Sequence, residues 1–188
     1  MTSHHLDITL MPDPEISAAH LLGALYDRLH LALVQQRRDD IGVSFPSYST
    51  APRNLGHVLR LHGSDQALRQ FLQADWLKGL RDHVRLTEIA AAPEGAPHRT
   101  VQRRQFKTNV ERMRRRRMRR KGETEEQSRQ AIPSTVERHP DLPYAQMRSS
   151  SSGQSYCLFI SLGPLTPTAV PGPFNSHGLS SASTIPWF

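Results

Sequence analysis

The chain has 188 residues, of which 37% are apolar and 22% are charged, so it can build a modest core and is not wholly disordered. No apolar run approaches the ~20 residues that cross a bilayer, and the N-terminus lacks the pattern of a secretory signal. Cys157 is the only cysteine, which excludes an internal disulfide and a zinc cluster built on thiolates. These features indicate a cytoplasmic protein.

The net charge of +7 is concentrated in one segment. Between Arg99 and Lys121 the chain carries 12 basic residues and a single acid, Glu111, which leaves 12 basic and 16 acidic residues elsewhere. A run with so little interleaved acid repels itself and attracts a polyanion. A solvated charged face is the ordinary interpretation of scattered charges, but the density of this run favours nucleic acid binding.

The first ninety or so residues alternate between strand-like and helix-like patterns. The expected elements are a strand at residues 6–10, a helix from Ser17 to about Gln36, strands at 41–45 and 55–62, a helix after Ser64, and a strand at 84–89. The order strand, helix, strand, strand, helix, strand predicts an α+β fold whose first domain, residues 1–92, is ferredoxin-like (βαββαβ).

The Pro- and Gly-containing stretch at residues 90–98 is the expected linker, and residues 93–188 form the expected second domain, also α+β. Thr108 or Asn109 caps a helix that runs to Lys121 and ends at Gly122, so an arginine-rich helix is expected at about 109–121. A shorter helix follows, capped by Thr124 and stopped before Pro133. Strands are expected at 154–161 and around 174–179.

The arginine-rich helix reads RMRRRRMRRK from Arg112. Its basic residues Arg112, Arg116, Arg119 and Arg120 recur at spacings of three and four, which gives one continuous guanidinium face. Guanidinium groups hold phosphate oxygens bidentately and stay charged at any working pH. The low aromatic content argues against a stacking platform for single strands, and no helix-turn-helix, zinc finger or heptad repeat accompanies the helix. Charge alone favours RNA and DNA about equally as the bound nucleic acid.

Seven segments together resemble one family, the CRISPR-associated endoribonuclease of type I-F systems, which processes the precursor of guide RNAs (crRNA). The segments are HLDITLMPDPE, LYDRLHLALV, IGVSFP, WLKGLRDHV, RRQFKTNVERMRRRRMRRK, MRSSSSGQSYCLFISLGPL and the terminal IPWF. They span nearly the whole chain, and their order and spacing make the resemblance specific.

The resemblance implies that the arginine-rich helix lies in the groove at the base of the CRISPR repeat hairpin. Arg116 and Arg120 match the groove-contacting arginines, with Arg112, Arg119 and Lys121 on the same helix. Arg103 and Gln105 match residues that read bases at the foot of the stem; arginine pairs with the guanine edge and glutamine with the adenine edge. Tyr156 matches an aromatic that stacks under the terminal base pair, although an ordinary core aromatic is the alternative for a strand residue.

The resemblance also implies cleavage by the RNA's own 2′-hydroxyl, with His30 as general base. His30 lies about 120° from the centre of its helix's leucine face, at ~100° per residue, so it stands beyond the core edge. The ordinary histidine pKa of ~6.5 suits proton transfer near neutrality. Ser149 matches a serine that positions the 2′-oxygen, and Ser151 is a secondary candidate within the run SSSS. No metal and no cofactor are expected.

One departure concerns His177 in FNSHGLS, where a member of the resembled family has a tyrosine beside the catalytic histidine. His177 could orient His30, act as a second acid or base, or be uninvolved. The resemblance further implies products with a 2′,3′-cyclic phosphate and a 5′-hydroxyl. It implies that the enzyme keeps the cleaved hairpin and becomes a subunit of the RNA-guided type I-F surveillance complex. The other protein subunits of that complex are then its partners, and it meets target DNA only through the complex.

Three alternatives differ from this reading in function. A hairpin-binding subunit of the same complex would hold the RNA without cutting it, and the change at His177 keeps this possibility open. A general RNA-binding or ribosome-associated protein would show no preference for a repeat hairpin and would leave the family-like C-terminal segments unexplained. A DNA-binding regulator fits least well, because no second DNA-binding feature follows the basic helix.

Overall fold

The computed structural model describes residues 2–106, 110–136, 140–149 and 153–188. The chain forms two compact units, one made of Met1–Arg104 with Leu142–Phe188 and a smaller one made of Gln105–Asp141. Both helices and antiparallel strands contribute to the structure, so the predicted α+β class is confirmed. The predicted boundary between residues 92 and 93 stays a prediction, since the larger unit contains strands from both sides of it.

The first sheet is built around strand β1 (His4–Leu10), which pairs antiparallel with β5 (Val58–Gly63) on one side and β6 (Val84–Leu86) on the other. Strand β2 (Gly42–Ser44) extends the order to β2-β5-β1-β6, and β7 (Ala90–Ala91) also pairs with β1. Alternate residues of β1 are buried, as the sequence pattern predicted. The expected strands of this half are confirmed, with β2, β5 and β6 shorter than predicted.

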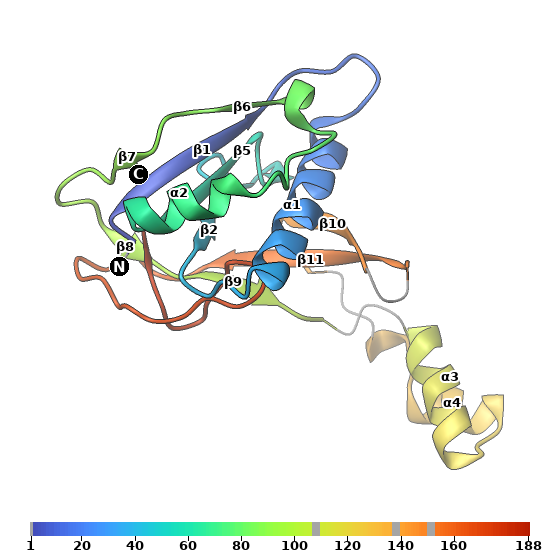
Figure 1. Ribbon diagram of the computed structural model, residues 1–188. Coiled ribbons are helices and arrows are strands. Elements are labelled where there is room, and N and C mark those ends of the chain that lie inside the picture. The colour runs from blue at the N-terminus through green and yellow to red at the C-terminus, as the bar shows by residue number, and fades with distance from the viewer. Residues whose placement is uncertain (1, 107–109, 137–139, 150–152) are drawn as a thin grey trace. The chain divides into compact units, whose positions relative to one another are not determined.

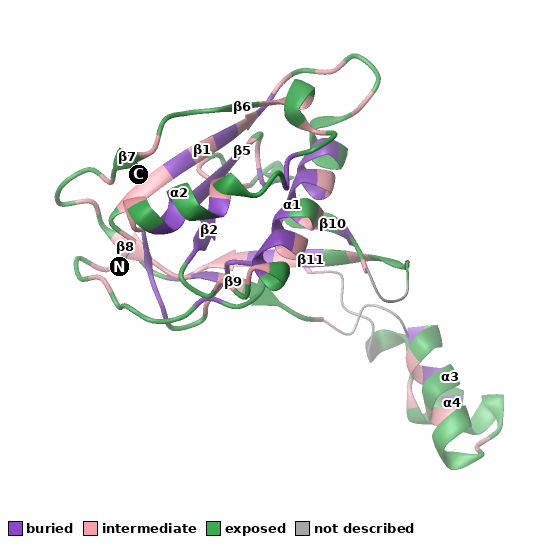
Figure 2. Ribbon diagram, in the orientation of Figure 1, coloured by how far each residue is buried: buried purple, intermediate pink, exposed green. Residues whose placement is uncertain are grey.

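Helices α1 (Ala18–Gln35) and α2 (Asp65–Gln73) begin where their caps predicted. The Ser17 hydroxyl accepts a hydrogen bond from the His20 N–H, and the Ser64 hydroxyl accepts one from the Ala67 N–H. These caps satisfy N–H groups that the first helical turn leaves without partners. Buried positions gather on one side of α1 and on the neighbouring strands, so the leucine face of this helix forms much of the core (Figure 2).

A second sheet, with the order β10-β11-β9, packs beside α1 (Figure 1). It consists of β10 (Tyr144–Arg148), β11 (Ser155–Leu162) and β9 (Val101–Arg104). Strand β11 confirms the expected strand at 154–161, while β9 and β10 were not predicted. Gly23 allows α1 to approach the edge of this sheet, because a β-carbon there would collide with the Gln146 carbonyl oxygen. This contact brings the middle of α1 against the β10–β11 hairpin.

Short elements complete the larger unit. These are β3 (Ser49–Thr50), β4 (Arg53–Asn54), β8 (His98–Arg99), β12 (Ile185–Pro186) and the 3₁₀ helix η1 (Arg81–His83). The expectation of a plain linker at 90–98 was wrong at both ends, because β7 pairs with β1 and β8 pairs with β12. A linker pattern in the sequence does not reveal backbone pairing with distant strands.

The strand expected around residues 174–179 was also wrong. The segment forms a turn, in which the Asn175 side chain accepts hydrogen bonds from the N–H groups of His177 and Leu179. Asparagine favours such turns because its side chain bonds the backbone two residues on. The turn is anchored to β2, since the Val43 N–H donates to the Gly178 carbonyl.

The smaller unit contains α3 (Val110–Lys121), α4 (Glu125–Ala131) and the 3₁₀ helix η2 (Ser134–Val136). Gly122 ends α3 with a φ of 65°, and Thr124 caps α4 through a reciprocal capping box with Gln127. Both predicted helices are therefore confirmed. The caps expected at Thr108 or Asn109 lie outside the described residues. None of the helices in the described part of the chain has the length and apolar content needed to cross a bilayer.

Candidate active site

His30 lies in the second half of α1, with its ring partly exposed. Its Nδ1 atom is 2.6 Å from the carbonyl oxygen of Ser176. A carbonyl oxygen can only accept a hydrogen bond, so Nδ1 carries a proton in this contact. In the neutral ring the basic lone pair is therefore on Nε2, and the bond to Ser176 fixes the ring's orientation.

His177 covers one face of the His30 ring. The two ring centroids are 4.0 Å apart and the ring planes differ by 13°. Burial, reinforced by the positive charges of His30 and Arg103, lowers the pKa of His177 to about 3. His177 is thus a neutral imidazole at physiological pH, since two stacked rings cannot both carry charge at low cost.

Two tyrosines hold His177 in place. The Tyr26 hydroxyl is fully buried and donates a 2.8 Å hydrogen bond to the His177 carbonyl oxygen. The Tyr156 hydroxyl on β11 lies 3.4 Å from Nε2 of His177. Burial raises the pKa of both phenols, so they act as neutral hydrogen-bonding groups. Tyr26 connects α1 to the turn at 174–179, and Tyr156 connects that turn to the second sheet.

Arg103 extends this cluster on β9. Its guanidinium carbon lies 5.9 Å from the centre of the Tyr156 ring, within the range of a cation–π contact. Arg103 itself is exposed. The structure therefore brings together four predicted site residues, Arg103, Tyr156, His177 and His30, in one chain of contacts.

Ser149 follows directly after β10, at the start of the segment that leads to β11. Its backbone N–H donates to the Gln154 carbonyl at 2.9 Å, and its carbonyl accepts from the Gly153 N–H at 2.8 Å. Ser151, the secondary candidate, lies outside the described residues. The end of β10 is tied to α1 by Asp27, whose two carboxylate oxygens lie 3.1 and 2.9 Å from the Arg148 backbone nitrogen. Asp27 precedes His30 by three residues, so one turn of α1 connects His30 to the Ser149 region.

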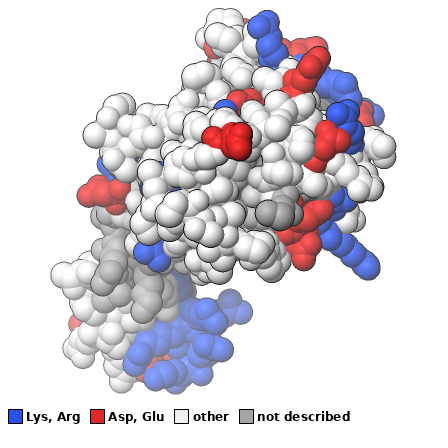
Figure 3. All heavy atoms as spheres, turned by 90° about the vertical axis from the view of Figure 1, so that its left-hand side faces the viewer, with Lys and Arg blue, Asp and Glu red and all other residues white. Residues whose placement is uncertain are grey.

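The arginine-rich helix lies in the smaller unit. Figure 3 shows Lys and Arg side chains gathered over one side of that unit. The predicted RNA-binding residues of α3 are all exposed: Arg112, Arg116, Arg119, Arg120 and Lys121. Gln105, which begins the smaller unit, is exposed as well.

Two arginines of α3 hold the smaller unit together. Arg114 is buried, and its guanidinium donates to the Ile132 carbonyl, the Glu111 carboxylate and the Ser134 hydroxyl. Arg117 forms a bidentate pair with Glu123, at 2.6 and 3.0 Å. The arginines of α3 therefore do not all face solvent, because a buried arginine can pack when its donors are satisfied.

Comparison with known proteins bears directly on this arrangement. Residues 5–188 match the family model for CRISPR-associated protein (Cas_Csy4). The chain belongs to this family. It is 49% identical over 185 residues to "CRISPR-associated endonuclease Cas6/Csy4" of Pseudomonas aeruginosa (strain UCBPP-PA14), an alignment that covers 98% of this chain and 99% of the relative. It is 42% identical over 185 residues to the protein of the same name from Escherichia coli (strain UTI89 / UPEC), and this alignment also covers 98% of this chain and 99% of the relative.

Membership of the Cas_Csy4 family confirms the resemblance found in the sequence, but the structure adds residues that the motifs did not single out. Asp27 accepts from the Arg148 N–H, the Ser176 carbonyl contacts Nδ1 of His30, and Asn175 shapes the turn that carries His177. Asp27 stands inside the family-like segment LYDRLHLALV, which was the one available signal. The Ser176 carbonyl has no side-chain signature, so no sequence pattern could have indicated it.

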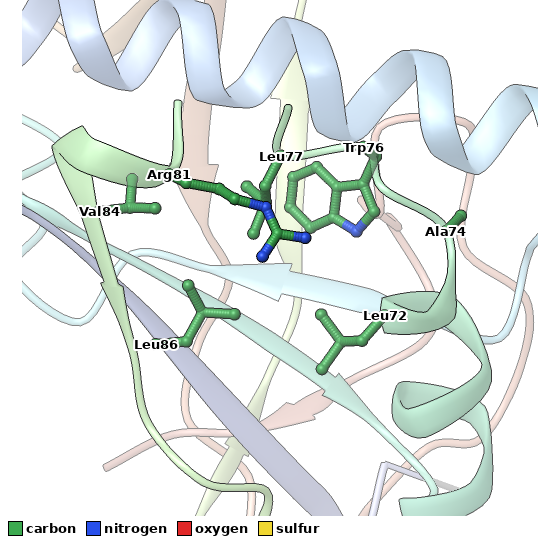
Figure 4. A pocket seen from close by; sticks show the side chains of 7 residues that line it. All are labelled: Leu72, Ala74, Trp76, Leu77, Arg81, Val84 and Leu86. Carbon is green, nitrogen blue, oxygen red and sulfur yellow. The ribbon is translucent and has the colours of Figure 1, made fainter. Parts of the chain in front are cut away.

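A separate hollow of about 260 Å³ lies in the larger unit, and Figure 4 shows its side chains converging from α2, η1, β6 and the segment before η1. It is lined by Leu72, Ala74, Trp76, Leu77, Arg81, Val84 and Leu86. None of the predicted site residues is among these. The family-like segment WLKGLRDHV therefore contributes to an apolar hollow and not to the His30 cluster.

Proposed function

We propose that this chain is an endoribonuclease that binds the CRISPR repeat stem-loop and cuts precursor crRNA at the base of the hairpin. The observation that carries the proposal is the oriented His30, whose Nδ1 is held by the Ser176 carbonyl and whose ring is stacked on the neutral His177. The names of the two relatives, both called endonucleases, support the same activity. The dense positive charge of α3 supports a polyanionic substrate.

The proposed reaction uses the 2′-hydroxyl next to the scissile phosphate as nucleophile. Nε2 of His30 accepts the hydroxyl proton, and the 2′-oxygen attacks phosphorus as the bond from phosphorus to the 5′-oxygen breaks. The 5′-oxygen takes up a proton from water and leaves as a 5′-hydroxyl, while the upstream strand ends in a 2′,3′-cyclic phosphate. Because the substrate supplies its own nucleophile, this reaction needs alignment and charge stabilisation but no metal ion.

Ser149 is the residue proposed to position the 2′-oxygen, with Ser151 as the second candidate. The bond between Asp27 and the Arg148 N–H supports this assignment, because it ties the residue before Ser149 to the helix that carries His30. His177 is proposed to orient His30. A pKa of about 3 leaves His177 unprotonated near neutrality, so it is unsuited to donate a proton to the leaving group there.

RNA recognition is assigned to two regions. The exposed face of α3, with Arg112, Arg116, Arg119, Arg120 and Lys121, would enter the groove of the stem, where guanidinium groups pair with phosphates and guanine edges. Arg103 and Gln105 would read bases at the foot of the stem, and Tyr156 would stack under its terminal base pair. The contact between Arg103 and Tyr156 supports the grouping of these two residues.

Three further proposals concern fold and assembly. The strand order β2-β5-β1-β6, with α1 after β1 and α2 after β5, supports a ferredoxin-like arrangement for the first half of the chain. The division into domains at 1–92 and 93–188 remains part of this proposal. The protein would keep its cleaved hairpin as a subunit of a type I-F surveillance complex, with that complex's proteins as partners and target DNA reached only through it.

The test is to incubate the purified protein with the CRISPR repeat RNA of its host in excess chelator. A parallel substrate carries a 2′-deoxy substitution before the scissile phosphate, and a parallel enzyme carries His30→Ala. We expect cutting at one site, lost by a factor of about 10² to 10⁴ with either change. Tight binding with no cutting by the unaltered protein would overturn the enzyme and leave a hairpin-binding subunit in its place.

A further inference from the structure

The turn at 174–179 holds His30 through a backbone group and not through a side chain. The Ser176 carbonyl oxygen lies 2.6 Å from Nδ1 of His30. This carbonyl and the N–H of His177 belong to the same peptide group, which is planar and has its C=O and N–H pointing in opposite directions. Whatever holds the His177 N–H therefore also decides where the Ser176 carbonyl points.

Asn175 holds that N–H. Its side-chain oxygen accepts a hydrogen bond from the His177 N–H at 2.8 Å and a second one from the Leu179 N–H at 3.2 Å. Its backbone closes the turn as well, because the Asn175 N–H donates to the Leu179 carbonyl at 2.9 Å and its carbonyl accepts from the Gly178 N–H at 2.8 Å. Ser176 lies inside this closed loop, so Asn175 fixes the peptide group that His30 meets.

Two other contacts anchor the turn to the core. The Val43 N–H donates to the Gly178 carbonyl at 2.8 Å, and the Tyr26 hydroxyl donates to the His177 carbonyl at 2.8 Å. These bonds act on the two following peptide groups, whereas Asn175 acts on the group that faces the catalytic histidine. The Asn175 side chain is exposed, so it contributes hydrogen bonds and not core packing.

We propose that Asn175 is a positioning residue for the reaction, because its side chain holds the His177 N–H and thereby aims the Ser176 carbonyl at Nδ1 of His30. The inference rests on the proposed function. With Nδ1 engaged as a donor, the lone pair of the neutral ring stays on Nε2, the atom proposed to take the 2′-hydroxyl proton. Without the Asn175 side chain this peptide group is free to rotate, and His30 loses the acceptor that selects its tautomer.

Two substitutions separate the hydrogen bonds from the rest of the residue. Asn175→Ala removes the side-chain acceptor at an exposed position and so leaves no cavity. Asn175→Asp keeps a side-chain oxygen for both N–H groups. Ser180→Ala is the matched control, because the Ser180 hydroxyl accepts from the N–H groups of Ala182 and Ser183 in the turn that follows.

Three quantities are measured for each protein. They are the single-turnover rate of repeat cleavage, the dissociation constant of a hairpin with a 2′-deoxy substitution at the cut site, and the tautomer of His30. The tautomer is obtained from the ring-nitrogen chemical shifts of protein labelled with ¹⁵N-histidine, at about pH 8, where an ordinary imidazole is neutral. His30→Ala assigns the signals, and the urea midpoint of each variant reports its stability.

We expect Asn175→Ala to slow cleavage about 10- to 100-fold through misplacement of His30, with the affinity for the 2′-deoxy hairpin unchanged. His30 should carry its proton on Nδ1 in the unaltered protein and on either nitrogen in the alanine variant. Asn175→Asp should restore most of the rate and the Nδ1–H tautomer. Ser180→Ala should leave both as they are in the unaltered protein.

An unchanged cleavage rate in Asn175→Ala would overturn the positioning role and show that the anchors at Val43 and Tyr26 suffice. A slower rate with an unchanged His30 tautomer would overturn it too, and a lowered urea midpoint would then assign the loss to general damage of the turn. Both results leave the proposed function standing, because the unaltered protein still cuts the repeat. If the unaltered protein does not cut, the proposed function fails, while the tautomer of His30 still tests the contact that Asn175 controls.

Discussion

The rings of His30 and His177 are stacked, with centroids 4.0 Å apart and planes inclined by 13°. The partners come from α1 and from the turn at 174–179, and only His177 is buried. Its pKa falls to about 3 because burial and the nearby charges of His30 and Arg103 disfavour the imidazolium. The ring that stacks on His30 near neutral pH is therefore a neutral imidazole.

Replacement of His177 by phenylalanine tests this division of roles. His177→Phe keeps a flat ring against His30 but loses the contact of Nε2 with the Tyr156 hydroxyl. We expect cleavage to slow by up to about 100-fold through misalignment of His30, with the shape of the rate profile unchanged between about pH 5 and about pH 9. The measurement is single-turnover cleavage across that range. Disappearance of an inflection present in the unaltered enzyme would show instead that His177 titrates during the reaction.

Asp27 is expected to act by holding the end of β10, next to Ser149. Asp27→Ala removes both acceptors of the Arg148 N–H, whereas Asp27→Asn keeps one amide oxygen in their place. We predict that kcat falls about 10- to 100-fold in the alanine variant and much less in the asparagine variant. Binding of a 2′-deoxy hairpin should stay unchanged in both. Equal losses in the two variants would indicate that the carboxylate charge, and not the hydrogen bond, is what His30 requires.

The exposed face of α3 should account for the salt dependence of hairpin binding. Substitution of both Arg116 and Arg120 by alanine removes two exposed guanidinium groups. We expect weaker binding and a plot of log Kd against log salt whose slope is smaller by about two. The matched control replaces Lys78 and Arg85, two exposed cations of the larger unit, by alanine. An unchanged slope in the α3 variant would remove this helix from the RNA interface.

Stability should decrease in mild acid because of His62. This residue is fully buried on β5, with Nε2 2.8 Å from the Ser44 hydroxyl. Burial lowers its pKa well below the ordinary value of 6.5, and the charges of Arg60, His5 and His98 add to that effect. As the pH falls through about 6.5, this histidine takes up a proton in the unfolded chain but not in the folded one. Below that pH the free energy of unfolding therefore decreases, by up to about 1.4 kcal/mol per pH unit for one such group.

The measurement is the urea midpoint between about pH 7.5 and about pH 5. The urea midpoint of His62→Gln should fall less steeply with decreasing pH than that of the unaltered protein. Part of the slope should remain, because the pKa of His177 is also lowered in the folded state. His57→Ala, which changes an exposed histidine, is the control and should leave the slope as it was. A slope that persists in full without His62 would assign the acid sensitivity to other groups.

The sequence by itself determined the features that depend on neighbouring residues. Ser17, Ser64 and Thr124 predicted the beginnings of three helices, because a cap bonds an N–H group only three residues away. The alternation of β1 and the basic run of α3 are equally local, and the family motifs indicated His30 and Ser149. The arrangement of β7 and β8 was beyond such patterns, since each pairs with a strand far away in the sequence.

Only the tertiary structure decided how the candidate site is held. The His30 ring is fixed by a carbonyl 146 residues later in the chain, and Asp27 meets the Arg148 N–H across 121 residues. A sequence pattern specifies which residues share a helix face or a strand face, but not which distant backbone group that face meets. That choice depends on the packing of α1 against β10 and of the turn at 174–179 against β2, which bury apolar surface from the whole chain.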